Sequence, residues 1–201
     1  TVLAAYESWC TASVNDPDPG FWGHWPRYYA EMPVKQDWVQ AAAKRCQTAV
    51  VVIGRSAGED RENTLKKGSF YLTNKEKALL DAVTTAFQKV VLVLNIGSIM
   101  DFAEIDAYGD KISAILLAWQ LGMESCNAVA DVLTGQVNPS GRLTDTIAKT
   151  YADYPAQNFG NKAENRYTED IFVGYRYFET FAPERVLYPF GYGLSYTDFA
   201  C

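Results

Sequence analysis

Acidic and basic side chains gather on one short stretch of the chain. Glu59, Asp60 and Glu62 lie within it, with Arg55 and Arg61 close by. The loop that holds them is about 18 residues long, whereas strand-to-helix loops usually have about 2–6 residues, and long loops are commonly functional. A carboxyl group placed among such charges suits general acid or base catalysis. A solvated, charged surface loop is the alternative interpretation of the same pattern.

Other catalytic chemistries lack the residues that they require. His24 is the single histidine, and Ser56 does not lie in the turn typical of a nucleophilic serine, which argues against a Ser-His-Asp triad. The glycines at 135–141 and 191–193 fail the spacing of nucleotide-binding loops. The cysteines show no paired spacing, which argues against a zinc site; they are Cys10, Cys46, Cys126 and Cys201. We therefore expect no metal and no cofactor.

Length and composition limit the classes of protein that remain. The chain has 201 residues, 48% of them hydrophobic, which is enough for one good-sized domain with a core. Its net charge of −6 argues against binding to nucleic acid, which requires a basic surface. No stretch reaches the roughly 18 apolar residues of a membrane span, so we expect no membrane partner. Scattered cysteines and no recognisable signal peptide favour a cytoplasmic setting.

The elements that must position the charged loop alternate between two kinds of pattern. Continuous apolar runs predict buried strands at 49–54, 90–95 and 114–119. Apolar residues at helical spacing predict helices at 36–45, 74–88 and 123–133. Thr73 and Glu76 form a capping-box pattern before the second helix, and Gly135 ends the third.

This alternation predicts an α/β fold: a three-layer sandwich around a mostly parallel, flavodoxin-like, doubly wound sheet. Ligands of such sheets bind outside the carboxyl ends of the strands, here the loops that begin at Gly54, Asn95 and Trp119. From about Asn138 onward the sequence is rich in Tyr, Gly and Pro. It predicts an irregular, aromatic-rich C-terminal tail packed over the sheet, with an extended segment at 171–178.

Two further features could contribute to a site. Trp22 and Trp25 lie in a long irregular loop and could stack on the apolar face of a sugar. Glu124 is a second acidic candidate at the start of a helix. A carboxylate there also favours the helix dipole, which explains Glu124 without any catalytic role.

The chain resembles the α/β-sandwich C-type domain of glycoside hydrolase family 3, the β-glucosidase family, over essentially its whole length. The resemblance is strongest at 172–178 and 189–197, in the phrases Phe-Val-Gly-Tyr-Arg-Tyr-Phe and Pro-Phe-Gly-Tyr-Gly-Leu-Ser-Tyr-Thr. Further matching phrases occupy 51–61, 68–72, 94–98 and 130–143. No single phrase is decisive, but together they identify the family.

The resemblance implies retaining hydrolysis of β-linked sugars by two carboxylates from different domains. Glu59 matches the family's acid/base, while the nucleophilic Asp belongs to a barrel domain that is absent here. Asp60, Arg61 and Glu62 would tune or position Glu59, and Glu62 is its rival because the loop is more compact than in many relatives. Glu59 is expected at the carboxyl edge of the sheet, exposed to solvent.

The resemblance also bears on how the domain relates to a longer protein. The resemblance implies that the family's first strand and helix are missing before Thr1, so residues 1–201 are expected to form one domain, truncated at its N-terminus and taken from a larger hydrolase. Such a domain alone should be inactive. Two other functions stay open: a carbohydrate-binding module without catalysis, and a flavodoxin-like FMN or signalling domain, which the acidic loop disfavours.

Overall fold

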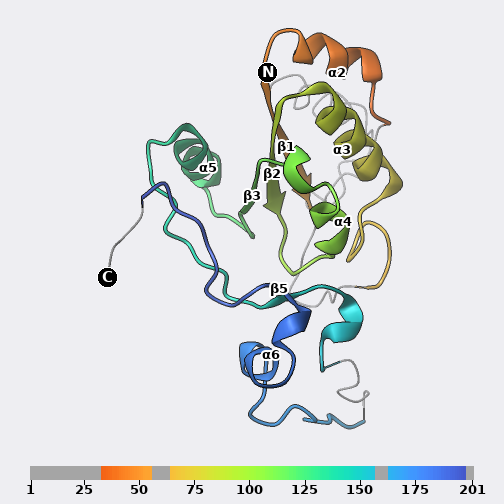
Figure 1. The fold of residues 1–201 in the computed structure, drawn as a ribbon, viewed down its shortest axis with the longest axis vertical. Coiled ribbons are helices and arrows are strands. Elements are labelled where there is room, and N and C mark those ends of the chain that lie inside the picture. Colours follow the sequence, from red (N-terminus) through yellow and green to blue (C-terminus); the bar gives the residue numbers. More distant parts are fainter. Residues whose placement is uncertain (1–32, 56–63, 157–162, 198–201) are drawn as a thin grey trace, which may run out of the picture. The chain divides into compact units, whose positions relative to one another are not determined.

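A computed structural model describes residues 33–55, 64–156 and 163–197 (Figure 1). The chain divides into two compact units. The described part of the first unit runs to Gly54 and includes Leu72–Leu94 and Asp110–Leu117. The second comprises Arg55–Tyr71, Asn95–Gly109 and the chain from Ala118 onward. Whether residues 1–201 form one domain stays a prediction.

The first unit contains a three-stranded sheet in the order β1-β2-β3. Its strands are β1 (Thr48–Gly54), β2 (Lys89–Asn95) and β3 (Ala114–Leu117). Strands β2 and β3 are parallel, with Val91 opposite Ala114 and Leu94 opposite Leu117. The predicted α/β class and parallel sheet are therefore confirmed, although β3 ends two residues earlier than expected.

Burial differs between the central strand and its neighbour at the edge. Leu92 and Leu94 of β2 are completely buried, as a continuous apolar run predicts for a central strand. The prediction that β1 is wholly buried is wrong. Val51 and Ile53 are buried, but Val52 is 57% exposed. Strand β1 lies at the edge of the sheet, and the face that carries Val52 has little cover, so its side chains alternate between core and solvent.

Two predicted helices accompany this sheet: α2 (Gln36–Ala43) and α3 (Asn74–Ala86). Helix α3 packs against both α2 and β1 (Figure 1). The capping box that begins α3 is confirmed: Glu76 N–H donates to Thr73 Oγ1 at 3.0 Å, and Thr73 N–H donates to Glu76 Oε2 at 2.7 Å. Two backbone donors at the start of the helix are thereby satisfied, which fixes where the helix begins.

In the second unit, helix α5 (Ser125–Thr134) was predicted from the sequence, whereas the short helix α4 (Ala103–Asp106) was not. Helix α5 ends at Gly135, whose φ of +76° is the left-handed conformation that glycine favours. Glu124 is its N-cap residue and accepts a hydrogen bond from Asn127 Nδ2 at 2.6 Å. Helix α4 is followed by the 3-10 turn η1 (Gly109–Lys111), which was not predicted either.

The C-terminal third is more regular than predicted, and the extended segment expected at 171–178 is wrong from Tyr175 onward. Helix α6 (Tyr175–Phe181) is followed by η3 (Pro183–Arg185) and β5 (Val186–Tyr188). Phe178 and Ala182 are four residues apart and pack on Ala148, so helical spacing buries them together. That buried face explains why a Tyr- and Phe-rich segment is helical here. The position of the aromatic tail over the sheet stays a prediction.

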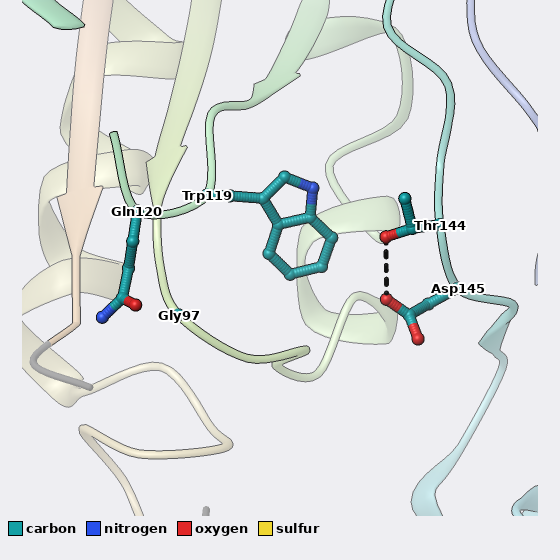
Figure 2. Close-up of a pocket in the computed structure, with 5 residues that line it drawn as sticks. All are labelled: Gly97, Trp119, Gln120, Thr144 and Asp145. Carbon is teal, nitrogen blue, oxygen red and sulfur yellow. Dashed lines mark hydrogen bonds between the residues drawn. The ribbon is translucent and has the colours of Figure 1, made fainter. Parts of the chain in front are cut away.

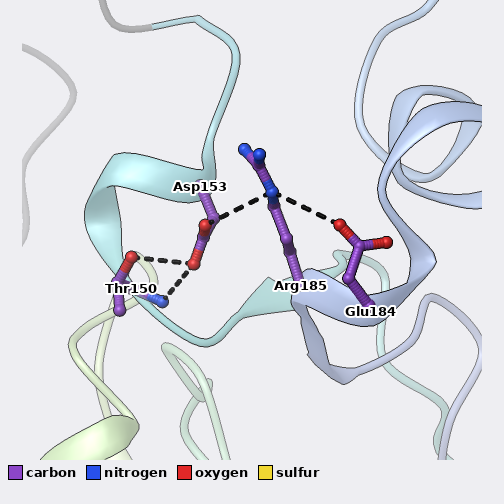
Figure 3. Close-up of polar contacts among 4 residues, drawn as sticks. All are labelled: Thr150, Asp153, Glu184 and Arg185. Carbon is purple, nitrogen blue, oxygen red and sulfur yellow. Dashed lines mark hydrogen bonds and ion pairs between the residues drawn. The ribbon is translucent and has the colours of Figure 1, made fainter.

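Strand β5 pairs antiparallel with β4 (Ile147–Ala148), which leads into the 3-10 turn η2 (Tyr151–Asp153). Figure 3 shows the polar contacts beside this pair. Thr150 N–H and Oγ1 donate to Asp153 Oδ2 at 3.0 and 2.7 Å, and Arg185 Nε lies 3.7 Å from Asp153 Oδ1. Arg185 is also 3.5 Å from Glu184 Oε1. Exposed ion pairs of this kind contribute little, so the capping contacts of Thr150 matter more.

Within the described ranges, no helix combines the length and apolar character needed to cross a membrane.

Candidate functional site

The side chains predicted to form the site lie outside the described residues. They are Glu59, Asp60, Arg61, Glu62, Trp22 and Trp25. Their roles and their placement stay predictions. What the structure does describe is the framework on either side of residues 56–63 and the surface at the ends of β2 and β3.

Arg55 connects the two ends of the segment that contains Glu59. Its backbone N–H donates to the Asn95 carbonyl at 3.0 Å, so it follows β1 and lies beside the end of β2. Its guanidinium donates through Nε to the Ser69 carbonyl at 3.3 Å and through Nη2 to the Tyr71 carbonyl at 3.4 Å. The planar guanidinium suits such paired contacts. The residues before and after the predicted catalytic segment are therefore held together.

The returning segment at 64–71 has further bonds of its own. Thr64 N–H donates to Ser69 Oγ at 2.9 Å, and Phe70 N–H donates to the Thr64 carbonyl at 3.2 Å. Phe70 is buried, and its ring lies edge-on to Tyr151 with centroids 5.7 Å apart. The Phe70 carbonyl also accepts from Asp101 N–H at 2.8 Å. This half of the loop has a fixed base in the second unit.

A shallow hollow of about 380 Å³ lies in the second unit (Figure 2). Its walls come from Gly97, Trp119, Gln120, Thr144 and Asp145. Figure 2 shows the Trp119 indole between the turn at Gly97 and the pair Thr144–Asp145, which is joined by a 3.2 Å hydrogen bond. Gly97 and Trp119 each follow a strand end by two residues. A hollow therefore lies where two of the three predicted strand-end loops begin.

Trp119 has an unusual backbone conformation. Its φ is +56°, which bulky residues rarely adopt. The left-handed conformation costs a residue other than glycine about 1–2 kcal/mol, so contacts with neighbouring segments must hold Trp119 in it. This backbone conformation turns the chain after β3, and the indole is partly exposed at the hollow.

Asp101 is the one described carboxyl group with a clear electrostatic perturbation. Burial is the main cause, and it raises the pKa of Asp101 above its ordinary value. The hydrogen bond from Ala103 N–H to Oδ1, at 3.3 Å, acts in the opposite direction, and the charge of Glu104 raises the pKa further. Asp101 caps the region before α4 and supports the base of the loop through Phe70. Its contacts are those of a structural residue.

Two of the sequence phrases that carry the family resemblance meet each other in the structure. Asn138 Oδ1 accepts from Ser195 Oγ at 3.0 Å and from Tyr196 N–H at 2.8 Å. Tyr196 OH donates to the Val132 carbonyl at 2.8 Å, in the last turns of α5. The residues at 189–197 thus attach the C-terminal segment to the end of α5. Their role in the described structure is to hold these segments together.

Gly193 belongs to the same junction and cannot be replaced without movement. A Cβ built there would lie 2.7 Å from the Gly141 carbonyl oxygen and 2.9 Å from Arg142 Cδ. Gly141 itself has open space at the corresponding position. Gly193 therefore allows two backbone segments to approach closely, which explains one glycine of the phrase Gly-Tyr-Gly.

Within the described residues, no group of three or more His, Cys, Asp or Glu side chains could hold a metal ion.

Comparison with known proteins identifies the fold and its family together. Residues 27–196 match the family model of the glycosyl hydrolase family 3 C-terminal domain. The chain belongs to glycosyl hydrolase family 3. The resemblance predicted from the sequence phrases is therefore confirmed, and the match covers most of this family 3 domain's described residues.

The chain is also similar to β-glucosidases of known sequence and structure. A β-glucosidase from Ruminococcus albus is 47% identical over 199 residues, which are 98% of this chain and 21% of that enzyme. The structure of a β-glucosidase from Paenibacillus barengoltzii is 43% identical, with a TM-score of 0.86 over 98% of this chain and 22% of its own. β-Glucosidase 3B from Thermotoga neapolitana, solved with glucose, is 36% identical, with a TM-score of 0.82 over 98% of this chain and 28% of its own.

The family 3 domain spans about a fifth of the length of the Ruminococcus enzyme. The activity of a longer protein that contains this domain is therefore proposed and not shown. Sequence reasoning located the strand-end loops, but it missed Thr144 and Asp145 as part of the hollow's wall. They follow the matching phrase at 130–143 directly, and nothing in their own sequence pattern points to a site.

Proposed function

We propose that the chain is the acid/base-bearing domain of a retaining β-glycosidase, similar to β-glucosidases, that hydrolyses terminal β-linked sugars. The match of residues 27–196 to the family 3 C-terminal domain carries this proposal. In the sequence, Glu59, at the position that resembles the family's acid/base, stands between Arg55 and the segment that Arg55 binds. That clamp supports a role in which the intervening loop must present a carboxyl group reproducibly.

The proposed chemistry uses Glu59 twice. As an acid it protonates the glycosidic oxygen while a nucleophilic Asp of a barrel domain attacks the sugar's anomeric carbon. As a base it then removes a proton from the water that breaks the glycosyl-enzyme bond, which returns the proton to Glu59. A retaining site needs the two carboxyl groups about 5–5.5 Å apart. Asp60, Arg61 and Glu62 would adjust the position and the charge of Glu59.

A barrel domain is the proposed protein partner, and the exposed apolar side chains of the second unit support such a partner. Large apolar groups that stay exposed in numbers often mark interaction surfaces. Seven of them are more than half exposed: Met123, Tyr167, Ile171, Val173, Phe181, Leu194 and Tyr196. Because the nucleophile would come from the barrel, the 201-residue chain alone should be inactive.

A hybrid enzyme tests this proposal. The chain replaces the matching residues of the Ruminococcus albus β-glucosidase, to which it is 47% identical. The hybrid should hydrolyse aryl β-glucosides, and Glu59→Gln should lower the turnover of substrates with poor leaving groups by about 100- to 10,000-fold. Glu62→Gln is the matched control and should have a much smaller effect. A folded but inactive hybrid, or a larger loss in Glu62→Gln, would contradict the assignment.

The isolated chain provides a second test. It should show no turnover of nitrophenyl β-glucoside above the rate in buffer. Glu124 is the in-chain carboxylate that could otherwise substitute for the nucleophile. Turnover well above background that disappears in Glu124→Ala would refute the two-domain mechanism.

A further inference from the structure

The hollow around Trp119 has the size and openness of a surface binding site. Its volume of about 380 Å³ lies within the range of about 300–1,000 Å³ typical of small-molecule pockets. Trp119 contributes an indole face that is only partly exposed, whereas Gln120, Thr144 and Asp145 are exposed. A bulky aromatic in a left-handed conformation, beside a hollow lined by polar groups, requires an explanation beyond packing.

The lining groups favour one class of ligand. An indole face offers an apolar surface for the C–H face of a pyranose ring. The Gln120 amide both donates and accepts hydrogen bonds, and the Asp145 carboxylate accepts them, so each can pair with sugar hydroxyls. No cation is among the five described residues that line the hollow, and Asp145 would repel a phosphate or a carboxylate. A neutral, polyhydroxylated ligand fits this combination better than a nucleotide or an organic acid.

One wall of the hollow is linked by a hydrogen bond to the start of the loop of the proposed acid/base. Arg55 N–H donates to the Asn95 carbonyl, and Gly97, which lines the hollow, follows Asn95 by two residues. Arg55, Asn95 and Gly97 all belong to the second unit. The beginning of the Glu59 loop and one wall of the hollow are therefore parts of the same strand-end structure.

We infer that this hollow is a carbohydrate subsite in which Trp119 stacks on a pyranose ring and Gln120 and Asp145 bind its hydroxyl groups. It binds one sugar unit of a β-linked glucan beside the loop that carries Glu59. The inference rests on the proposed function for its choice of ligand class. It does not require the chain to be catalytic, since the side chains that it invokes all belong to described residues outside 56–63.

Binding of cellobiose and cellotetraose to the 201-residue chain tests the inference. Saturation-transfer NMR detects the bound sugar, and the indole N–H signals report which tryptophan it touches. The wild-type chain should bind cellotetraose with millimolar affinity or better, and the Trp119 indole signal should shift. Trp119→Ala should weaken binding at least 10-fold, Trp119→Phe should retain most of it, and Asp145→Asn should weaken it several-fold.

Trp38→Ala is the matched control, because Trp38 is a half-exposed tryptophan of α2 outside the hollow, and it should leave binding unchanged. Far-UV circular dichroism verifies that each variant is folded. If Trp119→Ala does not fold, the Trp119 signal of the wild type and the isosteric Asp145→Asn decide the question. No binding by the wild type, or equal binding by Asp145→Asn without a Trp119 shift, would overturn the inference. Hydrolysis by the Glu59 variants is measured separately in the hybrid enzyme, so the subsite can fail while the proposed function stands.

Discussion

Removal of the Arg55 side chain should loosen the base of the loop that carries Glu59. Arg55→Ala eliminates the two guanidinium bonds to the Ser69 and Tyr71 carbonyls, at 3.3 and 3.4 Å. Hydrogen bonds from a charged group usually contribute about 1.5–3 kcal/mol, but both of these bonds are long, so each should contribute about 1 kcal/mol. Together they amount to about 2 kcal/mol, which corresponds to a roughly 30-fold change in an equilibrium constant.

Amide hydrogen exchange measures this change directly. The Phe70 and Tyr71 N–H groups bond within the segment, to the Thr64 and Lys66 carbonyls, and exchange when the segment opens. Their protection should fall about 30-fold in Arg55→Ala and by less in Arg55→Lys, which keeps the charge and can keep one bond. Lys66→Ala removes a cation from the same segment without removing a described bond, and should change little. Unchanged protection in Arg55→Ala would refute the clamp.

Three further substitutions have effects that follow from the packing. Gly193→Ala should reduce the free energy of unfolding, measured by urea denaturation, by about 1–3 kcal/mol because its Cβ would meet the Gly141 carbonyl. Gly141→Ala is the control and should be nearly neutral. Equal effects of the two substitutions would contradict the close approach of the two segments. Thr146→Val should stabilise the chain by about 1 kcal/mol in the same assay because the buried Thr146 hydroxyl has no hydrogen-bond partner among the described residues. A loss of stability would show that the hydroxyl is paired. Burial raises the pKa of Asp101 above 3.8, so stability is lost as the pH rises through that raised pKa. Asp101→Asn should therefore be more stable than the wild type at pH 7, and this difference should shrink below pH 4. A difference in stability that is independent of pH would contradict the shift.

The part of the fold predicted from sequence is the part governed by local patterns. Apolar runs located all three parallel strands, and the Thr73–Glu76 pattern identified the start of α3. Gly135 ended α5 as expected because left-handed backbone favours glycine. These signals depend on a few neighbouring residues, so one sequence suffices to recognise them.

The features that sequence reasoning missed depend on contacts between distant segments. The helix at Tyr175–Phe181 forms where Phe178 packs on Ala148, a partner that no local pattern indicates. The exposure of Val52 depends on the position of β1 at the edge of the sheet.

The candidate site likewise has parts that the sequence predicted and parts that it did not. The family phrases pointed to Glu59, and the predicted parallel sheet pointed to the strand-end loops. A hollow does lie beside the loops at Asn95 and Trp119. Asp145 reaches its wall from a separate segment that follows the phrase at 130–143. A contribution from such a distance cannot be read from spacing. The acid/base assignment itself stays a prediction from the resemblance.

Azide rescue tests the central claim, that Glu59 is the acid/base of a retaining glycosidase, most directly. In the hybrid enzyme, Glu59→Ala should still release the phenol of an activated aryl β-glucoside in a burst, because a good leaving group needs no proton, and then stall for lack of a base. Azide needs no base, so it should restore turnover and give a β-glucosyl azide, identified by NMR. No rescue in Glu59→Ala, with rescue in Glu62→Ala instead, would contradict the account.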